Sequence, residues 1–187
     1  ANVNAGSNLN VRGGTFANNA NLSAAGSAKL DVGNLINRGS IYGTTNTISA
    51  QDIDNSGGNV LAADQLSVNA RSLTQNANGT FVSGRDLSLE ISGVFENTNG
   101  KIIAGNDLGL KSDDTVDLSA AASGYIAAGN LLSIEAQGLV NSGNWTPNSR
   151  GLALTTFGDF SNTGIIELTG DFRITTNGNI SNSGEIK

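Results

Sequence analysis

The sequence lacks cysteine, methionine and histidine altogether, and it contains one proline and one tryptophan. Without cysteine, no disulfide framework and no thiolate metal site can form. Without histidine, no catalytic triad that uses an imidazole base is available. The absence of cysteine does not indicate either an oxidising or a reducing compartment, because that inference depends on how cysteines are used. The sequence therefore excludes disulfide scaffolds, thiolate metal sites and histidine-dependent catalysis.

Charge is also scarce. Only 14% of the 187 residues are charged, with 10 Lys and Arg against 16 Asp and Glu. Nucleic-acid binding needs clustered cations that release counterions from the phosphate backbone, and adhesion to an anionic bilayer needs a basic segment. The sequence has neither, so we expect no nucleic-acid partner.

Long apolar runs are missing as well. No run approaches the roughly 18 residues that span a bilayer as a helix, and residues 1–5 lack the basic and apolar regions of a signal peptide. The 37% of residues that are apolar are nevertheless placed with regularity, which favours a packed structure over a disordered linker. We therefore expect residues 1–187 to be a single repeat segment from the interior of a longer protein.

What the sequence does contain is a phrase that returns about every 20 residues. Its most constant part is an apolar residue, any residue and a second apolar residue. The pairs are Leu9/Val11, Leu30/Val32, Ile48/Ala50, Leu66/Val68, Leu87/Leu89, Leu108/Leu110, Leu132/Ile134, Leu152/Leu154 and Phe172/Ile174. Self-similarity at such a period predicts a solenoid.

Two further short strands accompany each pair. One precedes it by about six residues, as in Val60/Ala62, and is separated from it by a turn containing Gly or Asp, residues that suit tight turns. The other places an apolar residue two positions before an asparagine, as at Asn37, Asn55, Asn141, Asn162 and Asn182. Asn76 and Asn97 stand in similar places. Each coil is therefore predicted to have three strands, with stacked asparagines forming an amide ladder at one corner.

Two other architectures compete with this one. Leucine-rich repeats have a similar period, but helix stripes need apolar spacings of three and four, whereas the spacing here is two and glycine recurs in every coil. A hairpin meander could use the same turns, but it does not need the same residue type at the same place every 20 residues. A parallel β-helix does, because each residue stacks on its counterpart about 4.8 Å away. We therefore predict an all-β parallel β-helix.

The regular step is interrupted twice, at residues 111–125 and 144–151. Insertions in solenoids are commonly ejected as loops on one face, and loops often carry binding residues. The candidate binding residues are therefore Trp145, Arg150 and Tyr125, with Trp145 and Arg150 suited to stacking on a sugar or contacting a protein. The plain alternative is that Trp145 covers an exposed part of the coil.

Catalysis has one candidate group. Asp113, Asp114 and Asp117 are the densest acidic cluster, and parallel β-helices include polysaccharide lyases and hydrolases, so a polysaccharide-active enzyme is the alternative function. These residues lie in one stretch without an adjacent basic partner, so a solvated loop is the favoured interpretation. The sequence contains no calcium-binding nonapeptide, EF-hand loop or phosphate-binding glycine motif. We expect no enzyme activity, metal or cofactor.

The repeat resembles those of filamentous haemagglutinins. Residues 53–58 (Ile-Asp-Asn-Ser-Gly-Gly) followed by residues 61–68 (Leu-Ala-Ala-Asp-Gln-Leu-Ser-Val) follow that formula, and so do residues 94–110. The resemblance covers nearly the whole chain. It implies a right-handed β-helical stalk of a bacterial exoprotein, secreted to the cell surface through an outer-membrane transporter by two-partner secretion.

Members of that family are adhesins, haemophores or contact-dependent growth-inhibition proteins. The resemblance therefore implies a stalk or adhesive segment whose partner is a receptor or glycan on a host or bacterial cell. The Asn-Pro-Asn-Gly signature of the family's secretion domain is absent from these residues, so the segment alone is not expected to be exported.

Overall fold

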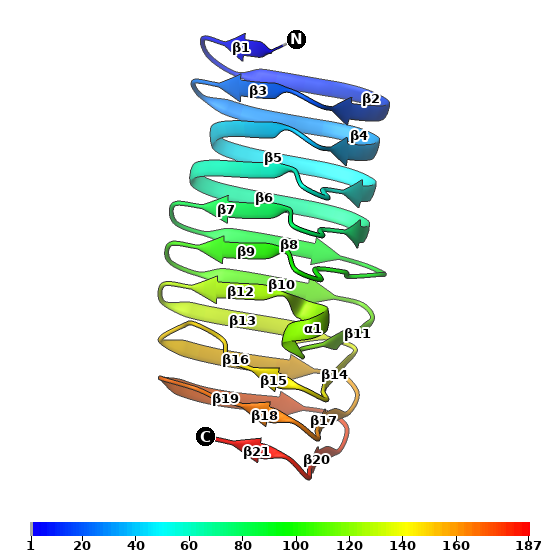
Figure 1. The fold of residues 1–187 in the computed structure, drawn as a ribbon, viewed down its shortest axis with the longest axis vertical. Coiled ribbons are helices and arrows are strands. Elements are labelled where there is room, and N and C mark those ends of the chain that lie inside the picture. The colour runs from blue at the N-terminus through cyan, green and yellow to red at the C-terminus, as the bar shows by residue number, and fades with distance from the viewer. Residues whose placement is uncertain (1) are drawn as a thin grey trace.

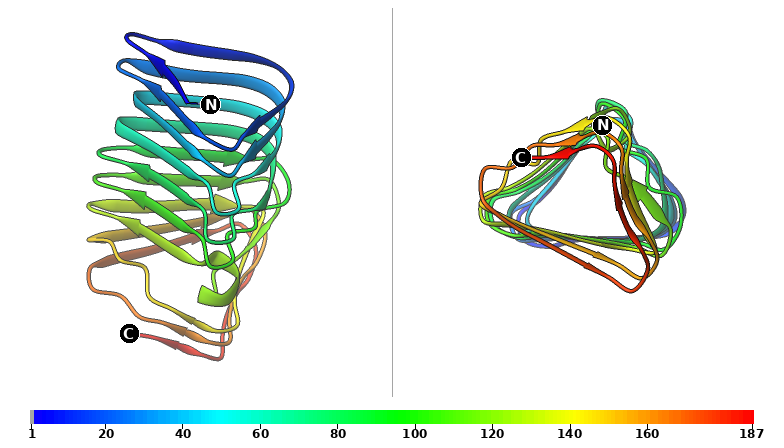
Figure 2. Two further views of the ribbon diagram at one scale, coloured as in Figure 1. Left: turned by 45° about the horizontal axis from the view of Figure 1, so that its top comes forward. Right: turned by 90° about the horizontal axis from the view of Figure 1, so that it is seen from below.

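The computed structural model describes residues 2–187, apart from the side chains of residues 75, 120 and 121. The chain winds as a parallel β-solenoid of about nine coils spaced about 20 residues apart, so the predicted fold class is confirmed (Figure 1). The coils stack along one axis, and each is roughly triangular when seen along that axis (Figure 2). The three predicted strands of a coil are the three sides of this triangle.

Each side of the triangle is a stack of parallel strands, which we call the first, second and third faces in chain order within a coil. The first face consists of β1 (Val3–Ala5), β3 (Asn21–Ala24), the starts of β5 (Ser40–Asp54) and β6 (Asn59–Gln75), β7 (Thr80–Ser83), β9 (Lys101–Ala104) and β12 (Tyr125–Ala128). Lower on the same side lies a separate sheet of β15 (Asn144–Trp145), β18 (Ile165–Ile166) and β21 (Glu185–Ile186).

The second face carries the Leu-x-apolar pairs. It consists of β2 (Leu9–Asn18), β4 (Ser27–Asn37), the middle of β5 and β6, β8 (Leu87–Ile91), β10 (Leu108–Ser112), β13 (Leu131–Ala136), β16 (Gly151–Thr156) and β19 (Asp171–Thr176). Like residues stack on like, because Leu66 pairs with Leu87, Leu87 with Leu108, and Leu108 with Leu132.

The third face begins with the ends of the long strands β2, β4, β5 and β6, which continue around a corner. It goes on with β11 (Thr115–Asp117), β14 (Gly138–Asn141), β17 (Phe160–Asn162) and β20 (Ile180–Asn182). A single helical turn, α1 (Ala120–Ser123), follows β11.

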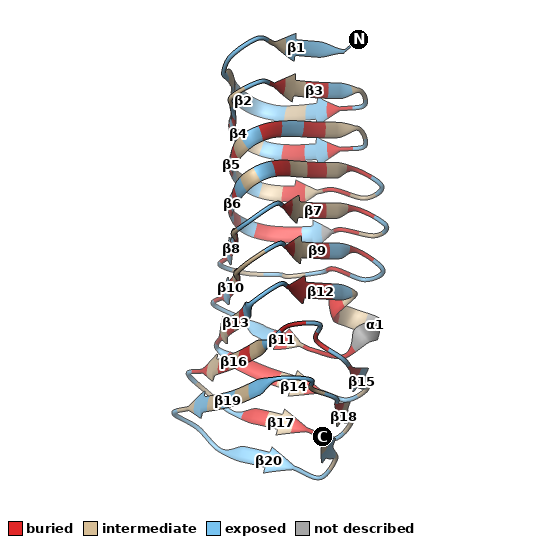
Figure 3. Ribbon diagram, turned by 90° about the vertical axis from the view of Figure 1, so that its left-hand side faces the viewer, coloured by how far each residue is buried: buried red, intermediate tan, exposed pale blue. Residues whose placement is uncertain are grey.

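The hydrophobic core fills the axis of the solenoid. In β6 the side chains of Val60, Leu66, Val68 and Leu73 are at most 1% exposed, and they come from all three faces of one coil. Along each side of the coil, inward-facing side chains alternate with outward-facing ones, since side chains alternate across a strand. Figure 3 shows this alternation of buried and exposed positions down the stack.

The predicted asparagine ladder is present at the corner between the third and first faces. Asn18 donates through Nδ2 to Oδ1 of Asn37 (2.8 Å), Asn37 to Asn55 (2.7 Å), Asn55 to Asn76 (2.8 Å) and Asn76 to Asn97 (2.6 Å). All five amides are buried. Each amide therefore satisfies its neighbour in the next coil, which is how a polar group can occupy the core.

The turn after the ladder requires glycine. A Cβ atom on Gly79 would lie 2.3 Å from Oδ1 of Asn76, and one on Gly100 would lie 2.2 Å from Oδ1 of Asn97. The preceding turn residues Asn78 and Asn99 have φ values of 55° and 57°, a left-handed conformation that asparagine tolerates better than most residues. The Asn-x-x-Gly phrase is thus explained by packing within the corner.

Candidate binding surface at the interrupted coils

The first interruption breaks the asparagine ladder. The pairing of β11 with β14 aligns Val116 with Leu139, and continuing that register places Leu118 opposite Asn141. Leucine thus stands where the other coils have asparagine. On one side of the break, Asn97 donates its amide to the carbonyl oxygen of Ser123 in α1. On the other side, Oδ1 of Asn141 is buried and has no hydrogen-bond partner among the described residues.

The expectation that residues 111–125 form an ejected loop is wrong for most of the segment. Val116 and Leu118 are 2% and 0% exposed, and Ser119 and Ser123 are also buried. The segment supplies a third-face strand, β11, and only α1 is added to the coil. Burial of the alternating apolar side chains of Val116 and Leu118 keeps this segment in the coil, although most of the surrounding residues are polar.

The acidic cluster serves local structure. A carboxylate oxygen of Asp114 accepts a hydrogen bond from the backbone N–H of Thr115 (2.7 Å), and one of Asp117 accepts from the N–H of Ser119 (2.9 Å). Among the described residues, no group of three or more His, Cys, Asp or Glu side chains is placed to hold a metal ion. Asp114 and Asp117 therefore stabilise the turns on either side of β11, and their geometry gives the alternative of a polysaccharide-active enzyme no support.

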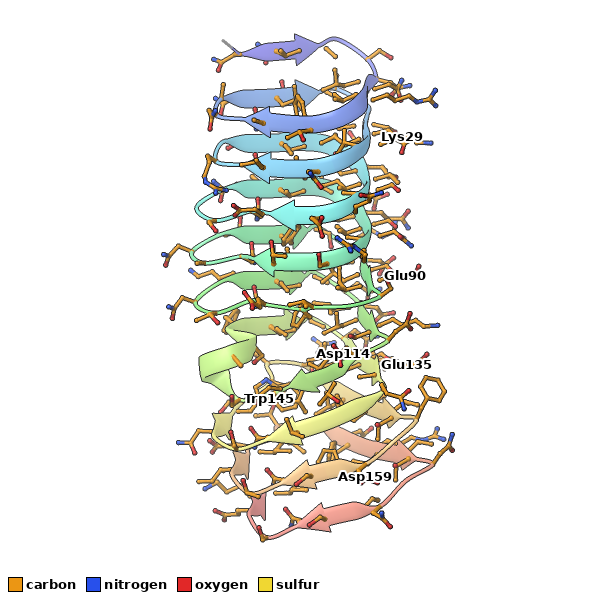
Figure 4. All side chains as sticks on the ribbon, turned by 90° about the vertical axis from the view of Figure 1, so that its right-hand side faces the viewer. Lys29, Glu90, Asp114, Glu135, Trp145 and Asp159 are labelled. Carbon is orange, nitrogen blue, oxygen red and sulfur yellow. The ribbon has the colours of Figure 1, made fainter. Side chains whose placement is uncertain are left out.

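Trp145 does not lie in an exposed loop, so its selection as a surface residue is wrong. It belongs to β15, pairs with Ile166 of β18, and its side chain is 2% exposed. It occupies the inward position that Phe81 and Ile102 hold in earlier coils, four or five residues after the ladder asparagine. Figure 4 shows Trp145 within the stack, below α1. The large ring fills the core where the coils are displaced by the insertion.

The second interruption leaves a gap in the first face. β12 pairs residue for residue with β9 above it. Below it, in the part of the chain that the structure describes, the pairing is reduced to one bridge, between Ala127 and Asn148. The missing part of the strand leaves two adjoining hollows of about 470 and 340 Å³, which share Tyr125, Asn148 and Thr169. We call these two hollows together the β12 hollow. Trp145 and Pro147 line one half, and Arg150 lines the other.

The structure thus brings all three candidate residues to one place, with different roles. Tyr125 is 43% exposed, and its hydroxyl accepts a hydrogen bond from Nδ2 of Asn148 (3.1 Å). Arg150 is exposed, and no carboxylate of the described residues lies within ion-pair distance of it. Trp145 lies buried beside the hollow.

Sequence reasoning missed Asn148 and Thr169. Asn148 was within the second interruption but was not distinguished from its neighbours. Thr169 lies one coil further on, and its hydroxyl lies 3.5 Å from the carbonyl oxygen of Ser149, 20 residues earlier. Thr169 could have been found by looking about 20 residues after each position of the second interruption, because residues one coil apart are neighbours in a solenoid.

Several charged residues of the upper coils pair with each other. Arg71 binds Asp52 (2.8 Å) one coil away, and the hydrogen bonds from Ser72 and Arg71 hold the pKa of Asp52 below its ordinary value. Burial by itself would raise the pKa of Asp54, but hydrogen bonds from Arg38 and Ser56 outweigh it, so this pKa is also lowered. Arg150 has no such partner among the described residues, and neither has Arg173.

Comparison with known proteins supports the repeat architecture. A family model described as haemagglutinin repeat matches residues 1–57, 61–121 and 114–184. No curated protein and no solved structure matches the chain. Repeats of this family are generally structural and occur in secreted, adhesin-type surface proteins. Within the described part of the chain, no helix has the length and hydropathy to cross a membrane. With matches over nearly its whole length, the chain belongs to the haemagglutinin repeat family.

Proposed function

We propose that this chain is a stalk segment of a large secreted exoprotein, an adhesin or a contact-dependent growth-inhibition protein, at the bacterial surface. The observation that carries the proposal is the in-register stacking of about nine coils. Parallel pairing joins successive coils on the second face from β2 to β19 without a break. Such a stack transmits position along its axis, so a part attached at one end is held at a fixed distance from the other.

The dimensions suit a spacer. Strands in a sheet are about 4.8 Å apart, so nine coils span on the order of 40 Å. A repeat of this kind obtains its stability from contacts between neighbouring coils, so its length can grow without a larger core. The role proposed here is therefore mechanical, and no residue of a regular coil is needed for chemistry.

We further propose that the exoprotein leaves the cell through an outer-membrane transporter of the two-partner type. The sequence has no cysteine, so no disulfide bond restrains the unfolded chain during passage. Because each coil pairs mainly with its neighbours, coils can fold one after another as the chain emerges in order. Secretion of the parent protein with and without its transporter gene tests this directly, and retention of export in the absence of any transporter would contradict it.

Removing whole coils tests the stalk proposal. Deleting residues 56–97 joins Asn55 to Thr98 and removes two coils while keeping the ladder in register. We expect the isolated segment to shorten by about 10 Å in small-angle scattering, and the parent exoprotein to keep its attachment to target cells. Loss of attachment by a correctly folded, shortened exoprotein would contradict a spacer role.

A matched control deletes residues 56–65, about half a coil. This change removes the first-face part of β6 and joins Asn55 directly to Leu66, so that one coil loses one of its three sides and can no longer close. We expect this shorter deletion to prevent folding and surface display. If the half-coil deletion were tolerated as well as the two-coil deletion, the stacked register would not be what the function depends on.

A further inference from the structure

The β12 hollow differs from the rest of the first face in shape. In the coils above it, each strand is covered by the next, as β7 is by β9 and β9 by β12. Below β12 the strand is replaced by residues 146–150, which turn away after Trp145. The resulting space, about 470 Å³ in its larger half, falls within the range of sites that hold small ligands. The hollow is therefore a feature of the interruption and not of the repeat.

The charge of the hollow also differs from its surroundings. Its lining contains Arg150 and no carboxylate, although the chain as a whole has a net charge of −6. Of the other arginines, Arg173 also has no ion pair among the described residues, whereas four lie within 4.0 Å of an aspartate: Arg12, Arg38, Arg71 and Arg85. A guanidinium with free donors recognises carboxylate and sulfate groups by paired hydrogen bonds. The hollow therefore suits a ligand that carries an anionic group.

The remaining lining suits a sugar ring. Tyr125 presents a partly exposed ring whose orientation is fixed by the hydrogen bond from Asn148, and an aromatic ring with a polar tip is an effective contact surface for an amphipathic ligand. The side-chain oxygen of Asn148 and the hydroxyl of Thr169 add hydrogen-bonding groups of the kind that hydroxyl-rich ligands pair with.

A peptide added as a strand is the less favoured occupant. Strand addition requires a row of free N–H and C=O groups at a sheet edge. At the lower edge of β12, the N–H of Ala128 already donates to the carbonyl oxygen of Asn148 (3.0 Å). Pro147, which follows Trp145 in the same lining, contributes no backbone N–H.

We propose that the β12 hollow binds an anionic saccharide, with Arg150 contacting the acidic group and Tyr125 the sugar ring. This inference rests on the proposed function, because a saccharide on a target cell is a partner that a surface exoprotein can meet. It assigns an adhesive role to one site of the segment and leaves the regular coils as spacer.

Titration of the full 187-residue chain with three probes tests the site. The probes are an oligosaccharide of uronic acids, a sulfated oligosaccharide of similar length, and the neutral carboxyl-reduced form of the first. We expect an anionic probe to bind and the neutral one to bind at least tenfold more weakly. The two anionic probes distinguish a carboxylate from a sulfate ligand. Equal binding of charged and neutral forms, or no binding of any probe at millimolar concentration, would overturn the proposal.

Variants locate the binding. Arg150→Gln and Tyr125→Ala should each lower affinity for the anionic probe by tenfold or more, and thermal melting should show that both variants fold. Arg85→Gln is the matched control, since this arginine is exposed but paired with Asp64 (3.2 Å), and its affinity should equal that of the wild type. Binding unchanged in Arg150→Gln would place the site elsewhere. The two-coil deletion tests the spacer role separately, because it leaves residues 98–187 intact.

Discussion

The upper coils, residues 18–104, and the lower coils, residues 138–187, both place a stacked asparagine at the corner between the third and first faces. The ladder of the upper coils is longer than that of the lower coils, and the interruption separates the two. Four consecutive amide–amide hydrogen bonds join Asn18 to Asn97, whereas the lower ladder joins only Asn141, Asn162 and Asn182. Between them, Leu118 and α1 occupy the corner. The two ladders are built alike and are not connected.

The difference shows which contacts a solenoid can lose. At the interruption, the third-face corner loses its amide bond and the first face is reduced to the bridge between Ala127 and Asn148. The second face keeps its full register, with Leu108 paired to Leu132 and Leu110 to Ile134. One continuous face is thus enough to hold the stack in line, while the corner and the neighbouring face accept extra residues. The candidate binding surface lies where the pairing of the first face and the amide bond of the corner are missing.

The largest expected effect compares one core aromatic residue from each region. Phe81→Ala in the upper coils should lower the free energy of unfolding by about 3–5 kcal/mol, the usual cost of such a cavity. Trp145→Ala should fall at the lower end of that range, because the space it leaves opens into the β12 hollow and can fill with water. Denaturant unfolding of both variants measures this. Tyr42→Ala, at a 44% exposed residue, is the control and should change stability by about 0.5 kcal/mol or less.

The next largest effect compares the loss of stability when one asparagine is removed from each ladder. Asn76→Ala leaves Oδ1 of Asn97 without its donor and breaks the bond from Asn55, so we expect a loss of about 2–3 kcal/mol. Asn141→Ala removes an oxygen that is already unsatisfied, and its loss should be smaller by about 1 kcal/mol. Asn69, which is exposed and bonds to Glu90 (2.9 Å), is the control. Equal losses for Asn76→Ala and Asn141→Ala would show that the unpaired oxygen carries no cost.

Acid should destabilise the upper coils through Asp52 and Asp54. Both have a folded-state pKa below the ordinary value of 3.8. Their contribution to stability is therefore fully present above pH 3.8 and is lost as the pH falls through the folded-state values. The Asp52→Asn, Asp54→Asn double variant should be less stable than wild type at pH 7 and lose less stability between pH 7 and pH 2. Ser72→Ala, which removes a donor to Asp52, should show the same trend more weakly.

The smallest expected effect concerns an ion pair on the second face, where the two regions are joined. Lys111 of β10 and Glu135 of β13 are 3.4 Å apart, and their side chains are 54% and 37% exposed. Exposed pairs contribute at most about 1 kcal/mol and weaken with salt. Lys111→Ala should therefore change the free energy of unfolding by less than about 0.5 kcal/mol. A larger loss would mean that charge pairing, and not the aliphatic stack, holds the second face together.

The regular coils could be predicted from the sequence because every position is constrained by its own copy one coil away. Leu66, Leu87 and Leu108 stack directly, so the period, the three strands and the asparagine ladder are all visible as repetition. Seven of the ladder asparagines were identified in this way. Asn18 was not, since the first coil has fewer neighbours for comparison.

The interruptions could not be predicted as well, because they have no copy to compare with. The burial of Trp145 follows from its register with Ile166, and that register is clear only once the preceding turn is known to lack one residue. The β12 hollow exists because a strand segment is missing from the first face, and no local sequence pattern predicts that missing segment. Tyr125 and Arg150 are candidates because they lie in the two interruptions, and only the structure shows that both line the same hollow as Trp145.

The spacing of the coils has a consequence for a protein under tension. A folded coil of about 20 residues advances the axis by about 4.8 Å, but the same residues span roughly 65 Å when fully extended. One coil that opens would therefore release about 60 Å of chain, more than the folded length of the whole segment. In an exoprotein of the proposed kind, the opening of a single coil would therefore keep two cells connected. We expect that extension to begin at the interruption beside Asn141, where the first face is reduced to a single bridge and the asparagine ladder is broken.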